Sequence, residues 1–128
     1  MPANLVLLVA RILLAIIFVM SGFGKLTNIA GTAGYFASYS LPAPTVVAVI
    51  VGLIELLGGL AVLVGFKTRI AAWVLAIFSV ASALVAHTDF ADQAQMINFL
   101  KNLAIAGGFL ALAVEGAGSI SVDGRRAA

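Results

Sequence analysis

Four long apolar stretches alternate along the chain with short segments that hold most of its polar residues. They cover about residues 5–24, 45–66, 70–87 and 96–117. Each approaches the about 20 residues that an α-helix needs to cross about 30 Å of hydrocarbon. The stretches lack the polar–apolar alternation of a barrel strand, so helices are the spanning structure we expect. The pattern predicts an all-α integral membrane protein, a four-transmembrane-helix bundle that forms a single domain over residues 1–128.

The connecting segments predict how the spans are arranged. The segment Gly65–Arg69 is so short that the second and third spans should be antiparallel neighbours. The first connection, residues 26–44, is long enough to hold structure, and Thr32 is a candidate helix cap within it. Three aromatic residues follow at helical spacing: Tyr35, Phe36 and Tyr39. We therefore predict a short interfacial helix in the first loop, with aromatic side chains that anchor it or contact a ligand.

Basic residues predict the orientation of the bundle. With four spans both termini share one side, and that side carries the larger group of basic residues: Lys67, Arg69, Arg125 and Arg126. Lys25 and Lys101 fall on the other side. Because Lys and Arg are enriched in cytoplasmic segments, we expect both termini in the cytoplasm. Residues 1–4 carry no basic side chain and Arg11 interrupts the first apolar stretch, so we interpret that stretch as a retained span rather than a signal peptide.

Composition narrows the class of protein further. Hydrophobic residues make up 63% of the chain and charged residues 9%, whereas soluble domains carry about 25% charged residues. Membrane lipid is therefore the expected surrounding of most of the surface. A net charge of +2 is too small for recognition of nucleic acid. The absence of cysteine excludes a disulfide scaffold, a thiolate metal site and an iron–sulfur cluster, and one histidine cannot supply two axial haem ligands. We expect no metal site and no covalently bound cofactor.

Charged residues inside the spans are the main candidates for function. A charge at mid-helix costs about 2.5–3.5 kcal/mol, so each should face the interior of the bundle. At about 100° per residue, the first span has one face that carries a basic residue at two depths. This face consists of Arg11, Ala15, Phe18, Gly22 and Lys25.

The second span places a carboxylate near the middle of the membrane. Glu55 shares a narrow stripe with Gly52 and Gly59, which are small enough to let another helix approach closely. A rise of about 1.5 Å per residue puts Arg11 within reach of Glu55, and Glu115 is an equally open partner, so we expect Arg11 to pair with one of these two carboxylates. Such a pair either locks two helices together or handles protons or a quinone.

The fourth span begins with a polar face formed by Asn98, Lys101 and Asn102. The side-chain amides of Asn98 and Asn102 either join helices by hydrogen bonds or contact a ligand. The candidates for an ion-pair partner of Lys101 are Asp89, Asp92 and Glu55. His87 lies at the outer boundary of the third span, where an imidazole exchanges protons near neutral pH.

Several short motifs occur in a recognisable order. They are Arg11, Ser21-Gly22-x-Gly24-Lys25-Leu26, Gly52-x-x-Glu55-x-x-Gly58-Gly59, Gly65-x-x-x-Arg69, Phe99-x-Lys101-Asn102-Leu103, Gly107-Gly108 and Gly116-x-Gly118-x-x-Ser121-x-Asp123. In order and spacing the chain resembles the DoxX family of small four-helix bacterial membrane proteins over almost its whole length. The tail departs from the family pattern at Ala117, where proline is common.

The resemblance implies a location and a class of function. The family takes its name from subunits of a terminal quinol oxidase and of a thiosulfate:quinone oxidoreductase. We therefore expect a protein of the bacterial cytoplasmic (inner) membrane. The site residues that the resemblance implies are Arg11, Lys25, Glu55, Lys101 and Asn102, and we add His87, Asn98 and Glu115 as secondary candidates from their positions.

Two functions follow as hypotheses. The first is a quinone- or quinol-interacting subunit of a membrane oxidoreductase system linked to sulfur or oxidative-stress metabolism. In this hypothesis quinone is a substrate, and another oxidoreductase subunit or a soluble enzyme supplies the redox centre. The alternative is a non-catalytic scaffold or anchor for soluble partner enzymes. A small-solute or proton pathway would need a homo-oligomer, because four short helices enclose little volume. The sequence leaves open whether the chain is itself an enzyme.

Overall fold

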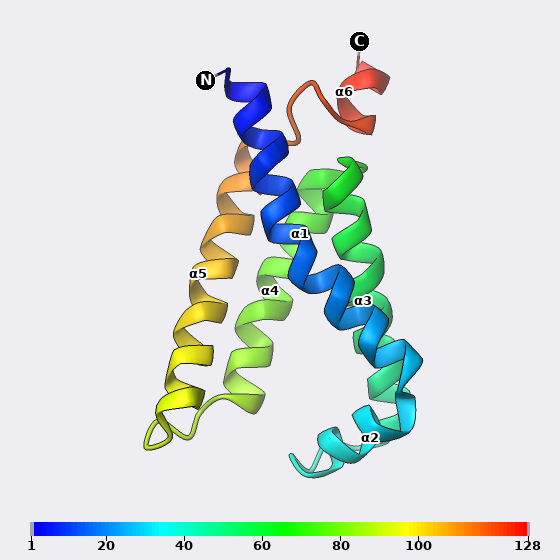
Figure 1. The fold of residues 1–128 in the computed structure, drawn as a ribbon, viewed down its shortest axis with the longest axis vertical. Helices are drawn as coiled ribbons and strands as arrows, with labels where there is room; N and C mark the ends of the chain where they lie inside the picture. The colour runs from blue at the N-terminus through cyan, green and yellow to red at the C-terminus, as the bar shows by residue number, and fades with distance from the viewer. Residues whose placement is uncertain (1, 128) are drawn as a thin grey trace.

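The computed structural model describes residues 2–127 and consists of helices joined by short connections (Figure 1). The elements are α1 (Ala3–Thr27), α2 (Ile29–Ala37), α3 (Pro44–Val64), α4 (Thr68–Ala86), α5 (Gln93–Glu115) and α6 (Val122–Ala127). Four of them, α1, α3, α4 and α5, are long and apolar enough to cross a membrane. The predicted four-helix membrane bundle with a short helix in its first loop is confirmed.

The four long helices pack as two close pairs. α1 lies against α3 and α4 lies against α5, while α3 and α4 are joined by a tight turn and contact each other less. Figure 1 shows both termini at one end of the bundle, and α2 and the loop between α4 and α5 at the opposite end. We call these the terminal end and the α2 end. An even number of spans requires this common side for the termini, as the sequence predicted.

Small residues bring α1 and α3 together. A Cβ atom added to Gly22 of α1 would lie 2.4 Å from the backbone nitrogen of Leu56, and one added to Gly59 of α3 would lie 3.0 Å from the backbone nitrogen of Val19. No side chain fits in this contact, so the two backbones touch over about two turns. The buried residues of α1 are Arg11, Ala15, Phe18 and Gly22. They include four of the five residues on the face that helical spacing predicted.

Aromatic and aliphatic side chains fill the middle of the bundle. Phe18 of α1 packs edge-on against Phe109 of α5, with ring centroids 5.5 Å apart, and Leu75 of α4 is fully buried beside them. This apolar layer separates the polar groups of the terminal end from those of the α2 end. The outer faces expose large hydrophobic side chains such as Met20 and Val114, which are 70% and 73% exposed. Lipid is the surrounding in which such faces are stable.

The short helix α2 begins differently from our prediction. Asn28 caps it, because its Oδ1 accepts a hydrogen bond from the backbone N–H of Gly31 at 3.2 Å. Thr32 lies inside the first turn, where its hydroxyl donates to the carbonyl of Asn28 at 2.9 Å. The prediction of Thr32 as the cap was wrong because α1 extends to Thr27, so α2 begins four residues earlier than that cap implied.

The tail after α5 folds back and caps another helix. Asp123 Oδ1 and Oδ2 accept hydrogen bonds from the backbone N–H groups of Lys67 and Thr68 at 2.8 and 2.9 Å. The backbone N–H of Asp123 donates in turn to the carbonyl of Gly65 at 2.8 Å. Burial opposes ionisation of this carboxyl, but the hydrogen bonds from Thr68 and Lys67 and the charge of Arg126 outweigh it and hold the pKa of Asp123 below its usual value. The tail is therefore tied to the turn that joins α3 and α4.

Candidate functional site

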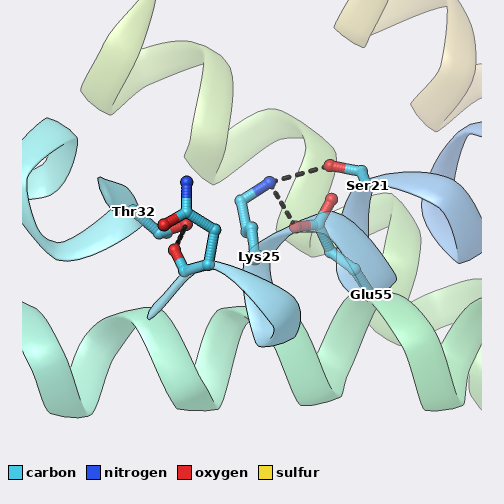
Figure 2. Close-up of polar contacts among 5 residues, drawn as sticks. Ser21, Lys25, Thr32 and Glu55 are labelled. Carbon is cyan, nitrogen blue, oxygen red and sulfur yellow. Dashed lines mark hydrogen bonds and ion pairs between the residues drawn. The ribbon is translucent and has the colours of Figure 1, made fainter. Parts of the chain in front are cut away.

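The centre of the candidate site is an ion pair between two helices. Lys25 Nζ of α1 lies 2.7 Å from Glu55 Oε1 of α3 and donates a hydrogen bond to Ser21 Oγ at 2.8 Å (Figure 2). The side chain of Glu55 is 7% exposed and that of Lys25 is 25% exposed. The pair is thus largely removed from solvent and lipid, and each charge stabilises the other.

The contact between α1 and α3 explains why these two residues meet. The Cβ of Lys25 lies 3.5 Å from the position where Gly52 would carry a Cβ, so the lysine begins one helical turn from Glu55 on the facing helix. Ser21 lies one turn before Lys25 on α1, on the same face. The two helices therefore place a hydroxyl, an ammonium group and a carboxylate in one row.

A polar hollow of about 230 Å³ lies beside this row, between α1, α4 and α5. Among its lining residues are most of the polar side chains that the sequence singled out: Lys25, Glu55, His87, Asn98, Lys101 and Asn102. The predicted polar face of the fourth span therefore does turn towards the carboxylate. Lys101 forms no ion pair with Asp89, Asp92 or Glu55 within the part of the chain that the structure describes.

A second hollow, of about 330 Å³ and mainly apolar, lies on the other side of the ion pair between α2, α3 and α4. Its walls include Tyr35 and Phe36 of α2, Tyr39 in the turn after this helix, and aliphatic side chains such as Val51. The two hollows share five lining residues: Lys25, Glu55, Phe78, Ser82 and His87. The ion pair therefore borders an apolar compartment on one side and a hydrogen-bonding compartment on the other.

The aromatic residues of α2 form a wall of this apolar hollow. Tyr35 Oη donates a hydrogen bond to Tyr39 Oη at 3.3 Å, and the two rings meet edge-on with centroids 5.1 Å apart. This hydrogen bond, together with burial, raises the pKa of Tyr35 to about 12. The phenol therefore stays protonated at neutral pH. The helical spacing of the aromatic residues predicted α2, but their place in the wall depends on how α2 folds back over α3.

Arg11 and Glu115 lie outside this site, at the terminal end of the bundle. Arg11 Nη2 donates to the backbone carbonyl of Ile120 at 2.6 Å. It pairs with neither Glu55 nor Glu115, so both predicted partners were wrong. Arg11 faces Gly65, whose added Cβ would clash with Nη1, and Gly65 lies ten residues, about 15 Å, beyond Glu55 along α3.

The carboxyl end of α5 is held by Arg69 of α4. Arg69 Nη1 donates to the backbone carbonyls of Ala113, at 2.9 Å, and Val114, while Nη2 lies 3.4 Å from the carbonyl of Glu115. The side chain of Glu115 is exposed. Cations are favourable at the last carbonyls of a helix, so Arg69 stabilises the end of α5.

Comparisons with known proteins place these observations in a family. A family model described as DoxX matches residues 6–88, which include Lys25, Glu55 and His87. The inner membrane protein YqjF of Escherichia coli K12 is 45% identical over 116 residues, covering 91% of this chain and 88% of the relative. The inner membrane protein YphA of the same organism is 39% identical over 124 residues, covering 93% of this chain and 89% of the relative.

A more distant relative matches only part of the chain. It is named "Putative oxidoreductase CatD", comes from Bacillus subtilis 168 and is 38% identical over 63 residues, covering 49% of this chain and 46% of the relative. No solved structure matches.

Proposed function

Because this chain belongs to the DoxX family and is a multi-pass inner membrane protein, we propose that it is a quinone- or quinol-interacting subunit of a membrane oxidoreductase system. The observation that carries the proposal is the position of the Lys25–Glu55 pair between an apolar and a polar hollow. The name of the Bacillus subtilis relative supports a link to oxidoreduction. A link to sulfur or oxidative-stress metabolism is part of the same proposal.

The two hollows suit the apolar skeleton and the polar ring oxygens of a quinone. The ring and isoprenoid tail are apolar, and the apolar hollow of about 330 Å³ falls within the range of about 300–1,000 Å³ that small-molecule sites occupy. The ring oxygens accept hydrogen bonds, for which Lys25 Nζ and the amides of Asn98 and Asn102 are donors.

Glu55 and Lys25 supply the proton chemistry of this proposal. Oxidation of a quinol releases two electrons and two protons: the carboxylate of Glu55 accepts one proton from a ring hydroxyl, and the second proton passes to bulk water at the α2 end. His87 lines both hollows near the α2 end. The electrons pass to a redox centre on another subunit or a soluble enzyme, since this chain has no cysteine and one histidine with which to hold a metal.

Quinol binding by the purified protein in nanodiscs tests this proposal. We expect saturable binding of a short-chain ubiquinol or menaquinol, weakened at least about tenfold by Glu55→Gln because a charged hydrogen-bond acceptor is replaced by a neutral amide. Lys25→Met should weaken it similarly. Glu115→Gln is the matched control, because it makes the same change on an exposed side chain at the terminal end. Unchanged affinity in folded Glu55→Gln protein would contradict the proposal.

A scaffold for soluble enzymes is the second candidate function, favoured by the ordered tail. Asp123 holds the tail against the α3–α4 turn, and Arg125 and Arg126 are exposed beyond it. Such a surface suits an acidic partner at the terminal end. Glu55→Gln separates the two candidates, since a scaffold should keep its partner while a quinol site should lose its ligand.

A further inference from the structure

The guanidinium of Arg11 is buried but only partly hydrogen-bonded. The residue is 1% exposed, and its recorded hydrogen bond is the one from Nη2 to Ile120. Among the residues that the structure describes, Nε and Nη1 have no hydrogen-bond partner. A guanidinium keeps its proton in proteins, and a buried donor without an acceptor costs about 1–3 kcal/mol, or more when it is charged. A negative charge close to the buried guanidinium would therefore be favourable.

The carboxylate of Asp123 is already engaged elsewhere. Asp123 acts on Arg11 electrostatically, but its two carboxylate oxygens accept the backbone N–H groups of Lys67 and Thr68. The carbonyl of Ile120, the acceptor that Arg11 does have, is neutral. The positive charge of Arg11 is thus incompletely balanced by the protein itself.

Arg11 lines a cavity of about 500 Å³ between the start of α1, the end of α3 and the tail. Arg125, Ser119 and Ser121 line it as well, so two arginines and two hydroxyl-bearing residues border it. The remaining wall is largely aliphatic and includes Leu8, Leu63 and Val64. A cavity with two positive charges and apolar walls matches an anionic, amphiphilic ligand.

We propose that this cavity binds the phosphate group of an anionic phospholipid, with the exposed Arg125 as the direct ligand of the phosphate and the buried charge of Arg11 attracting it from behind. The planar guanidinium group matches phosphate oxygens in geometry and charge, and basic pockets between transmembrane helices are known to bind lipid head groups. The aliphatic walls lie next to the lipid-facing surface of α3, where Val64 is 48% exposed, and acyl chains continue along that surface. Free phosphate shares the same head-group chemistry and is distinguished by experiment.

The test measures ligand-dependent thermal stability of delipidated full-length protein in a neutral detergent. Three probes are added separately: phosphatidylglycerol, phosphatidylcholine and inorganic phosphate. We compare the wild-type protein with Arg125→Gln and with Arg126→Gln. Arg126→Gln removes the same charge from the neighbouring residue, whose guanidinium lies over the ring of Phe66 and not in the cavity. Arg125 is exposed, so the variant is expected to fold.

Phosphatidylglycerol should raise the melting temperature saturably and phosphatidylcholine should not. Arg125→Gln should weaken the apparent affinity for phosphatidylglycerol about tenfold, and Arg126→Gln should change it less than twofold. If inorganic phosphate raises the melting temperature, the lipids do not, and Arg125→Gln abolishes the rise, the cavity is still a phosphate site but its ligand is soluble and not a lipid. Equal protection by the two lipids, or equal effects of the two arginine variants, would overturn the proposal. Neither variant touches Lys25 or Glu55, so this result is independent of the proposed quinol site.

Discussion

Gly22 and Gly24 lie two residues apart on α1 but have opposite surroundings. A Cβ added to Gly22 would lie 2.4 Å from the backbone nitrogen of Leu56, whereas one added to Gly24 would meet no atom within 4 Å. Backbone atoms cannot move aside without shifting the whole of α3. The absent side chain of Gly22 is therefore a requirement of the α1–α3 contact that brings Lys25 to Glu55.

Gly22→Ala should destabilise the bundle, because the added methyl group forces α1 and α3 apart. Overpacking of this kind costs about 1–3 kcal/mol. Gly24→Ala is the matched control and should leave stability unchanged or raise it by up to about 1 kcal/mol through higher helix propensity. Thermal unfolding in detergent, followed by circular dichroism, measures both. Equal melting temperatures for the two variants would show that α1 and α3 are not in backbone contact.

At the scale of the element, α4 depends on a cap from the other end of the chain. Its first turn has no side-chain cap of its own, and Asp123 supplies the acceptors for the N–H groups of Lys67 and Thr68. Four N–H groups at the start of a helix lack partners within it, so such a cap stabilises α4 directly. The negative charge also lies at the positive end of the helix dipole.

Asp123→Asn should lower stability by about 1 kcal/mol, because the charge of the cap is lost. The folded protein holds the pKa of Asp123 below its usual value, so the stabilising effect is present above about pH 4 and disappears as the pH falls through the folded pKa. The wild-type protein should therefore lose more stability on acidification than the variant. Melting temperatures between neutral and acidic pH measure this difference. Asp89→Asn, in the exposed α4–α5 loop, is the control and should keep the acid dependence of the wild type.

The helices and their buried faces were predictable from local pattern, and the contacts between them were not. Periodicity placed Arg11 and Lys25 on one face of α1 and Glu55 on one face of α3, and the structure buries Arg11 and Glu55 and half-buries Lys25. Which cation meets Glu55 depends on the register of α1 against α3. That register is fixed by glycine contacts such as that of Gly22 with Leu56, which no single helix reveals.

At the scale of the whole molecule, the tail was the least predictable part. Its fold depends on contacts with residues far away in the sequence: Ser119 N–H donates to Asn4 Oδ1 at 3.0 Å, and Ile120 accepts from Arg11. Helical periodicity cannot predict such contacts, because they join segments more than a hundred residues apart in the sequence. The same tail closes the terminal end and divides the polar residues of the chain into two sites. Arg11 belongs to the terminal end, and Lys25 and Glu55 belong to the α2 end.

The orientation of the bundle decides to which compartment each site opens. Lys67, Arg69, Arg125 and Arg126 all lie at the terminal end, so the preference for basic residues on the cytoplasmic side predicts that this end faces the cytoplasm. The α2 end, with the hollows around Glu55, then faces the periplasm. A quinol oxidised at this site would release its protons outside the cell, whereas the phospholipid cavity would open to the cytoplasmic leaflet.

Single cysteine variants test this orientation. The chain has no cysteine of its own, so all labelling of this protein comes from the introduced residue. Ala91→Cys lies in the exposed loop of the α2 end and Ser119→Cys in the exposed tail. A membrane-impermeant maleimide should label Ala91→Cys in cells with a permeabilised outer membrane and label Ser119→Cys only after the inner membrane is disrupted. The reverse pattern would place the Lys25–Glu55 pair on the cytoplasmic side. In that orientation a quinone would take up protons from the cytoplasm on reduction, so the labelling result fixes the direction of proton movement that any redox partner of this site must accommodate.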